Sequence, residues 1–546
     1  MKKRISLLLC GIMAVSLLAG CGGGGAAAGS SAAGSGAAGS GAAAGGKTLK
    51  FGCITFGNGR IDPSLETNTA WNCMRIGVSE ALFKFDDNAA VQPWLAESIK
   101  ASDDHKTWTI TIKKDVKFST GTPMTATKVK ESLDWVREQS KKDEKREKAN
   151  KIKTYLPYEA EIKADDAANT LTITTPDPVL NLAANLCQPV TAIVDVAETK
   201  DFESGIIGTG PYVVKSFKDQ VGFEMEANKN YWEGKVPFES LSIIFMADAA
   251  AKTNALKSGQ VDFVENISNA SDIKSVQDDP NFELDLGQSI RTGFAFMNMG
   301  KDRALKNKEL RKAIEMAIDF DAICKSNTIG GLYVSGAAIL PTTLNYGSKE
   351  LNDANPYKYN PEEAKKTLDA AGIKDNDGDG FRELDGKIID LQIVSYESRC
   401  LNDFSDAYIQ YLKEVGIKVT PKYGTGDDEW NSLVAGEYDF NNSNWQTVPT
   451  GDPQAFLDNW YSKSEGNYCS YKNDEYDKLY ESLKAEFDAT KRADIIKQMQ
   501  KILIDDAVVL VDGYYTASMA YSKNVKGVHI TPIDFYWVTS KIAPAN

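Results

Sequence analysis

A tract of 25 consecutive residues, from Gly22 to Gly46, contains only glycine, alanine and serine. Such a tract has no side chains that could bury much apolar surface, so it cannot contribute to a packed core. We expect it to act as a flexible tether with a random-coil span of roughly 25–30 Å. The fold should therefore begin near Lys47. The chain from there to Asn546 is too long for one small core and predicts two or three lobes.

The segment before the tract is typical of an export signal. A basic start, Lys2 to Arg4, precedes an apolar stretch from Ile5 to Leu18, which is too short for a comfortable membrane span. The stretch ends in Leu18-Ala19-Gly20-Cys21, which resembles a bacterial lipobox. The resemblance implies that residues 1–20 are a lipoprotein signal peptide and that the sulfur of Cys21 carries diacylglycerol. The alternative is an ordinary secretory signal in which Cys21 occurs by chance.

These features predict where the protein is found. We expect an exported protein that is lipid-anchored to the outer face of the cytoplasmic membrane, because no other apolar run is long enough to span a bilayer. Residues 21–46 would then be the lipidated cysteine and its tether. The lipid anchor would be the protein's contact with the membrane.

Composition excludes several function classes. The net charge of −14 argues against nucleic acid, because phosphate binding needs clustered lysine and arginine. His105 and His529 are the chain's two histidines, and no CxxC or HExxH motif occurs. The string GAAAGGKT (41–48) fits GxxxxGK[ST], but it lies largely in the Gly/Ala/Ser tract and follows no predicted strand, as a phosphate loop would. We therefore expect no zinc site built by the protein, no nucleotide phosphate loop, no catalytic residues and no cofactor. The cysteines after Cys21 could pair but are too few for a disulfide framework: Cys53, Cys73, Cys187, Cys324, Cys400 and Cys469.

Strand and helix patterns occur throughout the chain. The run Thr107 to Ile112 (TWTITI) alternates as a half-buried strand does, and Leu171 to Thr174 repeats the alternation. A helix is predicted from Pro361, with Asn360 as its cap and Gly372 as its end. Apolar stripes at helical spacing predict two further core-facing helices, one with Leu310, Ala313, Ile314, Ala317 and Ile318, the other with Phe404, Ala407, Tyr408, Leu412 and Val415. This mixture predicts an α/β or α+β body.

Two groups of short motifs carry a family resemblance. The first group runs PWLAES (93–98), SDD (102–104), KKDVKF (113–118) and GTPMTA (121–126). The second runs GTGPY (208–212), NKNYW (228–232) and ALKSGQVD (255–262). Their order and spacing closely resemble the extracellular solute-binding family that serves oligopeptide, dipeptide and nickel ABC importers. Further matches lie in 291–319 and 360–372, so the resemblance covers essentially everything after the tether.

The resemblance implies a fold and its partners. The family fold is α/β and two-lobed, of the periplasmic-binding-protein type II-like class (cluster C), with a hinge and a ligand cleft between the lobes. It implies a discontinuous lobe one, residues 47–288 and 512–546, and a lobe two, residues 289–511. The chain would cross near Ser289–Thr292 and near Val511–Gly513. Hinge closure on a small-molecule cargo would create the face that ABC permease subunits recognise, and we expect a monomer.

The C-terminal half resembles one branch of the family more than another. SYESR (395–399), WQTVPTGDPQ (445–454) and PIDFYW (532–537) are similar to the branch that binds nickel and metallophores. Peptide binders usually differ around the Gly451-Asp452-Pro453 segment. The resemblance therefore implies a nickel or other metal chelate as cargo, with an oligopeptide or dipeptide as the alternative. A receptor or chaperone role, known for relatives of this fold, also stays open.

Six residues are the candidate ligand contacts. The resemblance implies that arginines hold the carboxylates of a chelate, a task that suits the planar guanidinium fork. Arg399 and Arg291 are the candidates for this role, and a surface or inter-lobe salt bridge is the alternative for each. The candidate pocket walls and approach residues, which could instead be ordinary core, are Trp445, Tyr396, Trp71 and Asn72.

Two possible metal sites are weighed from the residues. His529 could complete the coordination of a transported metal, as a histidine does in some nickel binders, but a structural role is favoured. The run Asp375-Asn376-Asp377-Gly378-Asp379-Gly380 resembles a calcium loop, yet its twelfth position is Gly386 and not glutamate. A solvated turn is therefore favoured for this loop, and we assign no protein-bound metal.

Overall fold

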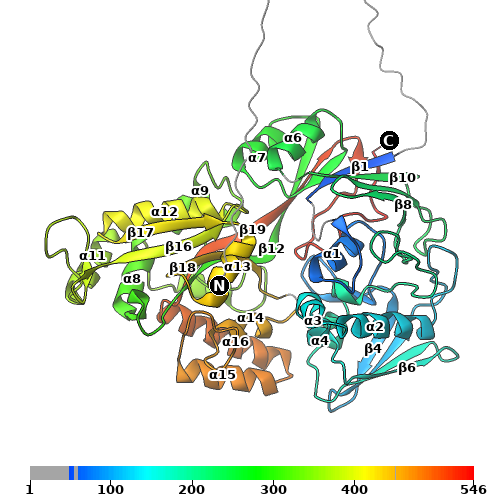
Figure 1. Ribbon diagram of the computed structural model, residues 1–546, viewed down its shortest axis with the longest axis horizontal. Coiled ribbons are helices and arrows are strands. Elements are labelled where there is room, and N and C mark those ends of the chain that lie inside the picture. The colour runs from blue at the N-terminus through cyan, green and yellow to red at the C-terminus, as the bar shows by residue number, and fades with distance from the viewer. Residues whose placement is uncertain (1–47, 55–58, 247, 449, 546) are drawn as a thin grey trace, which may run out of the picture. The chain divides into compact units, whose positions relative to one another are not determined.

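The computed structural model describes residues 48–54, 59–246, 248–448 and 450–545 (Figure 1). The predicted signal peptide, Cys21 and the predicted tether lie outside these residues. No helix in the described part of the chain is long and apolar enough to cross a membrane.

One large sheet runs through the described residues. Its strand order is β17-β16-β18-β12-β19-β11-β1-β10-β9-β8, and β13 pairs with β19 at its side. The pairs β1–β10, β1–β11, β16–β17 and β16–β18 are parallel, and the others are antiparallel. The strands are β1 (Thr48–Cys53), β8 (Tyr212–Lys218), β9 (Gly222–Ala227), β10 (Ser240–Phe245), β11 (Phe263–Glu265), β12 (Phe282–Met297), β13 (Tyr333–Val334), β16 (Asp390–Tyr396), β17 (Lys418–Gly424), β18 (Phe440–Gln446) and β19 (Val509–Ser522).

The long strands β12 and β19 join the two ends of this sheet (Figure 1). Their antiparallel register is regular from Phe282↔Ser522 to Gln288↔Thr516 and resumes at Thr292↔Tyr514, with a second irregularity after Gly293. These irregularities coincide with the predicted crossings at 289–292 and 511–513. The lobe boundaries themselves remain a proposal.

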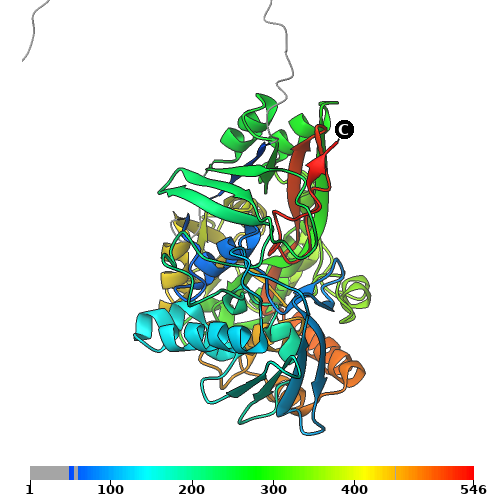
Figure 2. The same ribbon diagram turned by 90° about the vertical axis from the view of Figure 1, so that its right-hand side faces the viewer.

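A four-stranded antiparallel sheet, β4-β5-β7-β6, forms a separate layer with helix α2 (Ala126–Ser140) packed along it (Figures 1 and 2). Its strands are β4 (Ala96–Ala101), β5 (Thr107–Ile112), β6 (Glu161–Asp165) and β7 (Thr170–Thr174). The strand predictions for 107–112 and 171–174 are confirmed. As predicted, Trp108, Ile110 and Ile112 are buried and the residues between them are not.

The predicted helices also form. Helix α11 (Pro361–Ala370) is capped by Asn360, whose Oδ1 accepts from the Glu363 N–H at 3.0 Å. Helix α8 (Lys308–Ala317) and helix α12 (Leu401–Glu414) bury the predicted stripes, except that Ala407 is only half-buried and that Ile318 and Val415 lie just past the helix ends. The described part is thus a mixed α/β structure.

The remaining helices are α1 (Thr67–Arg75), α3 (Glu144–Asn150), α4 (Ile152–Tyr155), α5 (Leu182–Asn185), α6 (Ala249–Lys257), α7 (Ala270–Gln277), α9 (Phe320–Lys325), α10 (Ser348–Asp353), α13 (Gly426–Ala435), α14 (Gln454–Leu457), α15 (Asp474–Ala485) and α16 (Ala489–Asp505). The described part of the chain also contains the 3₁₀ helices η2 (Pro189–Thr191), η3 (Ala304–Lys306) and η4 (Asp458–Trp460). Three two-stranded sheets pair β2 (Phe83–Phe85) with β3 (Val91–Pro93), β14 (Glu383–Leu384) with β15 (Lys387–Ile388), and β20 (Val525–Lys526) with β21 (Ala543–Pro544).

The buried apolar side chains form three clusters. One follows the large sheet from β1 to β17, and one lies under the four-stranded sheet. The second cluster also takes in Ile290 and Val448, which belong to predicted lobe two. The predicted crossings are therefore packed segments rather than loose linkers.

Candidate functional site

A buried ion pair joins the end of α1 to the C-terminal segment of the chain. Arg75 Nη2 lies 2.7 Å from Asp534 Oδ2, and Arg75 Nε donates to the Asp534 carbonyl oxygen at 2.8 Å. The Arg75 guanidinium lies between two indole rings, 4.6 Å from the centroid of Trp71 and 4.1 Å from that of Trp537. Arg75 and Asp534 are both buried. The pair is thus fixed by hydrogen bonds and by cation–π contacts on both faces.

Asp534 lies close to three arginines. Burial raises the pKa of its carboxyl group, but the charges of Arg75, Arg291 and Arg399 outweigh burial and hold the pKa below its usual value. Its second oxygen, Oδ1, accepts from Gln446 Nε2 at 3.2 Å. The structure therefore gathers three cations around one carboxylate.

Arg291 lies on β12, opposite Gln446 on β18. It is buried, with 9% exposure, and its Nη1 donates to the Asn444 carbonyl oxygen at 3.3 Å. Burial and, after it, the neighbouring charge of Arg399 lower the pKa of Arg291 to about 10. Among the described residues, no carboxylate oxygen lies within 4.0 Å of this guanidinium.

Arg399 lies in the turn between β16 and α12. Its backbone is left-handed, with φ +48°, and so is that of Cys400, with φ +59°. The Tyr333 hydroxyl donates to the Arg399 carbonyl oxygen at 2.8 Å and helps hold this turn. The half-buried guanidinium lies 5.7 Å from the ring centroid of Tyr515 and, in the described part of the chain, also lacks a carboxylate within 4.0 Å.

The candidate contacts Tyr396, Trp71 and Asn72 have different surroundings. Tyr396 is half-buried at the end of β16 and interacts electrostatically with Arg399 and Arg291. Trp71 stacks on Arg75 and packs against Phe535. Asn72 is buried, and its Nδ2 donates to the Arg60 carbonyl oxygen at 3.0 Å.

Trp445 opens onto a hollow of about 730 Å³. Its ring lies 5.3 Å from that of Phe296 and 6.1 Å from that of Trp430, whose side chain is exposed. The hollow is lined on one side by α3, α4 and the residues around them, and on the other by Trp430, Trp445, Gln446, Ala455, Phe456, Asn459 and Tyr468. The two sides belong to predicted lobes one and two.

Gln446 connects the hollow to the arginines. It lines the hollow, donates to Asp534 and is paired across the sheet with Arg291. The hollow and the group Arg75, Arg291, Arg399 and Asp534, which we call the arginine cluster, are therefore neighbours. A volume of this size falls in the range of small-molecule sites.

The histidines have other partners. His529 Nδ1 lies 2.7 Å from Asp285 Oδ2, and Nε2 lies 3.0 Å from Asp87 Oδ1. Burial lowers the pKa of His529, but both carboxylates outweigh it and raise the pKa. His105 stacks on Phe487 at 4.5 Å. Both nitrogens of His529 thus contact carboxylates, which leaves neither directed at a metal in this arrangement.

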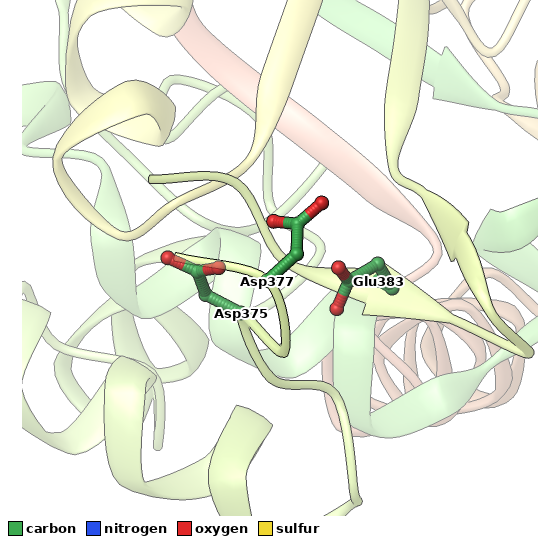
Figure 3. A group of neighbouring side chains, drawn as sticks. All are labelled: Asp375, Asp377 and Glu383. Carbon is green, nitrogen blue, oxygen red and sulfur yellow. The ribbon is translucent and has the colours of Figure 1, made fainter. Parts of the chain in front are cut away.

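The acidic loop brings three carboxylates together (Figure 3). One oxygen from each of Asp375, Asp377 and Glu383 lies within 4.8 Å of the others. The Asp375 side chain accepts from the N–H groups of Gly378 and Gly380, and Glu383 Oε2 accepts from Asn376. These contacts are those of a tight hydrogen-bonded turn.

The remaining predictions concern cysteine and the Gly451-Asp452-Pro453 segment. Every cysteine in the described residues is unpaired.

Asp452 forms a bidentate ion pair with Arg492 of α16, at 2.9 and 2.8 Å. This segment, interpreted as a mark of cargo type, therefore also has a packing role.

The sequence reasoning missed Arg75 and Asp534 as members of the cluster. Arg75 lies four residues after Trp71, a spacing that puts both on one helix face. Asp534 lies inside the quoted PIDFYW motif. Arg75 thus shares a helix face with the candidate residue Trp71, and Asp534 belongs to a motif that carries the family resemblance.

A model of the family described as "Bacterial extracellular solute-binding proteins, family 5 Middle" matches residues 90–468. The chain is 26% identical over 465 residues to the "Oligopeptide-binding protein AppA" of Bacillus subtilis (strain 168), covering 83% of each protein. It is 25% identical over 475 residues to the "Nickel-binding protein NikA" of Staphylococcus aureus (strain NCTC 8325 / PS 47), covering 85% of this chain and 89% of that protein.

Solved structures agree on the fold. The crystal structure titled "Nickel ABC transporter from Bacillus halodurans" superposes with a TM-score of 0.73 at 26% identity, over 91% of this chain and 99% of that one. NikA from Staphylococcus aureus in complex with Ni(L-His)₂ superposes with a TM-score of 0.71 at 23% identity, over 91% and 100%. The fold expected from the motifs is confirmed.

Proposed function

The chain belongs to the bacterial extracellular solute-binding proteins of family 5, and we propose that within this family it captures a metal chelate, of nickel or another metal, through the carboxylates of the chelate. Members of the family are the substrate-binding proteins of ABC importers and are not enzymes. They bind small ligands and deliver them to ABC permeases. The proposal concerns the cargo, its site and the anchor.

The observation that carries the proposal is the charge of the arginine cluster. Arg291 is buried and Arg399 is half-buried, and neither has a carboxylate within 4.0 Å among the described residues. A buried cation without a partner is unfavourable. Carboxylates of an incoming ligand would supply the missing partners, each in the bidentate geometry that guanidinium favours.

The scarcity of histidine supports a chelate over a bare metal ion. The chain's two histidines are His105 and His529, and both ring nitrogens of His529 contact carboxylates. A chelator brings its own nitrogen and oxygen ligands, so the protein needs to supply only cations and aromatic walls. Tyr396 and Trp445 are proposed as those walls, with Trp71 behind the cluster, while Asn72 is proposed only as an approach residue.

A peptide is the second candidate. The relative named AppA is an oligopeptide-binding protein and is as similar to this chain as the nickel binder is. The hollow is also lined by Glu144 and Glu147, which could receive the ammonium group of a peptide. The two cargoes therefore need a direct test.

Native mass spectrometry of protein purified from its own host tests the cargo. A chelate predicts an adduct that carries the isotope pattern of its metal and is lost when the protein is partly unfolded and dialysed. A ladder of adducts with amino-acid composition and no metal would replace the proposal with the peptide alternative.

The site works by closure in this proposal. Lobe one is taken as residues 47–288 and 512–546 and lobe two as 289–511, and the hollow lies between residues of both. Ligand that contacts both lobes would shift the population toward a closed form. The lipidated Cys21 would hold this monomeric protein at the membrane, near its permease.

A further inference from the structure

The buried charges around Asp534 do not balance. Arg75 and Asp534 neutralise each other, with side-chain exposures of 1% and 9%. The neighbouring pair Lys252–Glu265 is also closed, at 2.9 Å with exposures of 5% and 1%. Arg291 and Arg399 remain, each without a carboxylate within 4.0 Å in the described part of the chain. Two positive charges are therefore left over.

Asp534 is not free to move to these two arginines. Its Oδ2 is held by Arg75, its Oδ1 by Gln446, and its backbone carbonyl oxygen by Arg75 Nε. Arg75 in turn is stacked between Trp71 and Trp537. The Asp534 carboxylate is thus paired with Arg75, so carboxylate partners for Arg291 and Arg399 have to come from outside the cluster.

Arg291 is buried and Arg399 is half-buried, and their like charges repel each other, so carboxylate partners for them are favourable. Each guanidinium fork accommodates one carboxylate. One carboxylate would leave a guanidinium unpaired, and a third carboxylate would have no cation within the cluster. The cluster therefore fits a ligand with two carboxylates better than a ligand with one or three.

This inference rests on the proposed function and goes one step further. We infer that the arginine cluster selects cargo that presents two carboxylates, and that Asp534 sets this number by neutralising Arg75. Asp534 is accordingly a specificity-determining residue, although it contacts another protein side chain and not the cargo. Removing its charge should shift the preference to three carboxylates, and removing the charge of Arg399 should shift it to one.

The test is a calorimetric titration with nickel complexes that differ in carboxylate number. The probes are the nickel complexes of ethylenediamine-N-monoacetate, ethylenediamine-N,N′-diacetate and nitrilotriacetate, which carry one, two and three. Two tripeptides, triglycine and glycyl-glutamyl-glycine, provide the same contrast of one and two carboxylates without metal. The proteins are the wild type, Asp534→Asn, Arg399→Gln and the double variant, with the exposed Asp219→Asn as the matched control.

Wild type and control should prefer two carboxylates by roughly thirtyfold or more. Asp534→Asn should prefer three, Arg399→Gln should prefer one, and the double variant should return to two because its net charge is restored. A structural role alone would weaken all probes together and leave the preference in place. Circular dichroism confirms that each variant is folded, and Arg399→Gln keeps the test decisive if Asp534→Asn does not fold.

The outcomes separate the two proposals. Tight binding of the tripeptides and none of the nickel complexes removes the chelate cargo, while the carboxylate preference is still read from the tripeptides. Binding of the nickel complexes with a preference that stays at two in every folded variant overturns this inference and leaves the chelate proposal in place. Binding of neither series overturns both.

Discussion

Replacing Asp512 with asparagine should remove a large pH dependence from the stability of the protein. Asp512 lies on β19 at the second predicted crossing and is completely buried. Its Oδ1 accepts from the Tyr408 hydroxyl of α12, and its Oδ2 has no hydrogen-bond partner in the described structure. Burial raises the pKa of this carboxyl to about 8, although the Tyr408 hydrogen bond lowers it somewhat.

The size of the effect follows from proton linkage. In the unfolded chain Asp512 ionises at its ordinary pKa of 3.8, whereas in the folded protein it keeps its proton to about pH 8. The folded state thus holds one more proton in this window, so stability is fully present below pH 3.8 and falls as the pH rises. At about 1.36 kcal/mol per pH unit, wild type should lose about 4 kcal/mol relative to Asp512→Asn between pH 5 and pH 8.

Urea unfolding followed by tryptophan fluorescence at several pH values measures this difference. Other buried acids, such as Glu80 and Glu429, also have raised pKa values. They contribute equally to both proteins and cancel in the comparison. The unpaired amide of the variant adds a pH-independent cost of about 1–3 kcal/mol. Tyr408→Phe is the matched control: without the hydroxyl the carboxyl pKa rises, so the downward slope should extend to higher pH. Parallel pH profiles for wild type and Asp512→Asn would refute the reasoning.

Three further predictions follow from other parts of the chain. Cys21→Ala should leave the precursor unlipidated and released from the membrane, and detergent phase partitioning would contradict this if the variant still entered the detergent phase. Small-angle scattering should show a smaller radius of gyration with bound cargo, and an unchanged radius at saturation with a cargo shown to bind would argue against hinge closure. Asp452→Asn should destabilise the protein by about 3–5 kcal/mol, because Arg492 is buried and loses its charged partner; a thermal melt like that of the exposed Asp377→Asn would show the pair to be dispensable.

Local patterns predicted much of the secondary structure. The TWTITI alternation predicted β5, and Asn360 with Pro361 predicted the start of α11, because both signals depend on neighbours in sequence. The family motifs predicted the two-lobed fold. The crossings at 289–292 and 511–513 stay a prediction, and the sequence did not indicate that these segments lie within two long paired strands.

The arginine cluster could be predicted only in part. Arg291 and Arg399 were candidates through the family resemblance, and the structure places both near Asp534. The pair Arg75–Asp534 could not be predicted, because its members are 459 residues apart and meet only through the tertiary fold. The negative charge of Asp534 nevertheless decides how many of the three arginines remain for a ligand. Sequence reasoning therefore found the cations and missed the carboxylate that limits them.

The central claim is that a metal chelate is held by these arginines through its carboxylates. Calorimetric titration of wild type and Arg399→Ala tests it most directly, with nickel alone, nickel–histidine, an opine-type metallophore complex with nickel and a mixed peptide library. The surface variant Arg60→Ala serves as the control, since its ion pair with Glu203 is exposed.

The account predicts that wild type and Arg60→Ala bind a chelate and not bare nickel. Arg399→Ala should lose about 2–5 kcal/mol, roughly thirtyfold to several thousandfold in affinity. Tight binding of peptides without binding of chelates would contradict the claim about cargo. Chelate binding that is unchanged in Arg399→Ala would contradict the claim about the site.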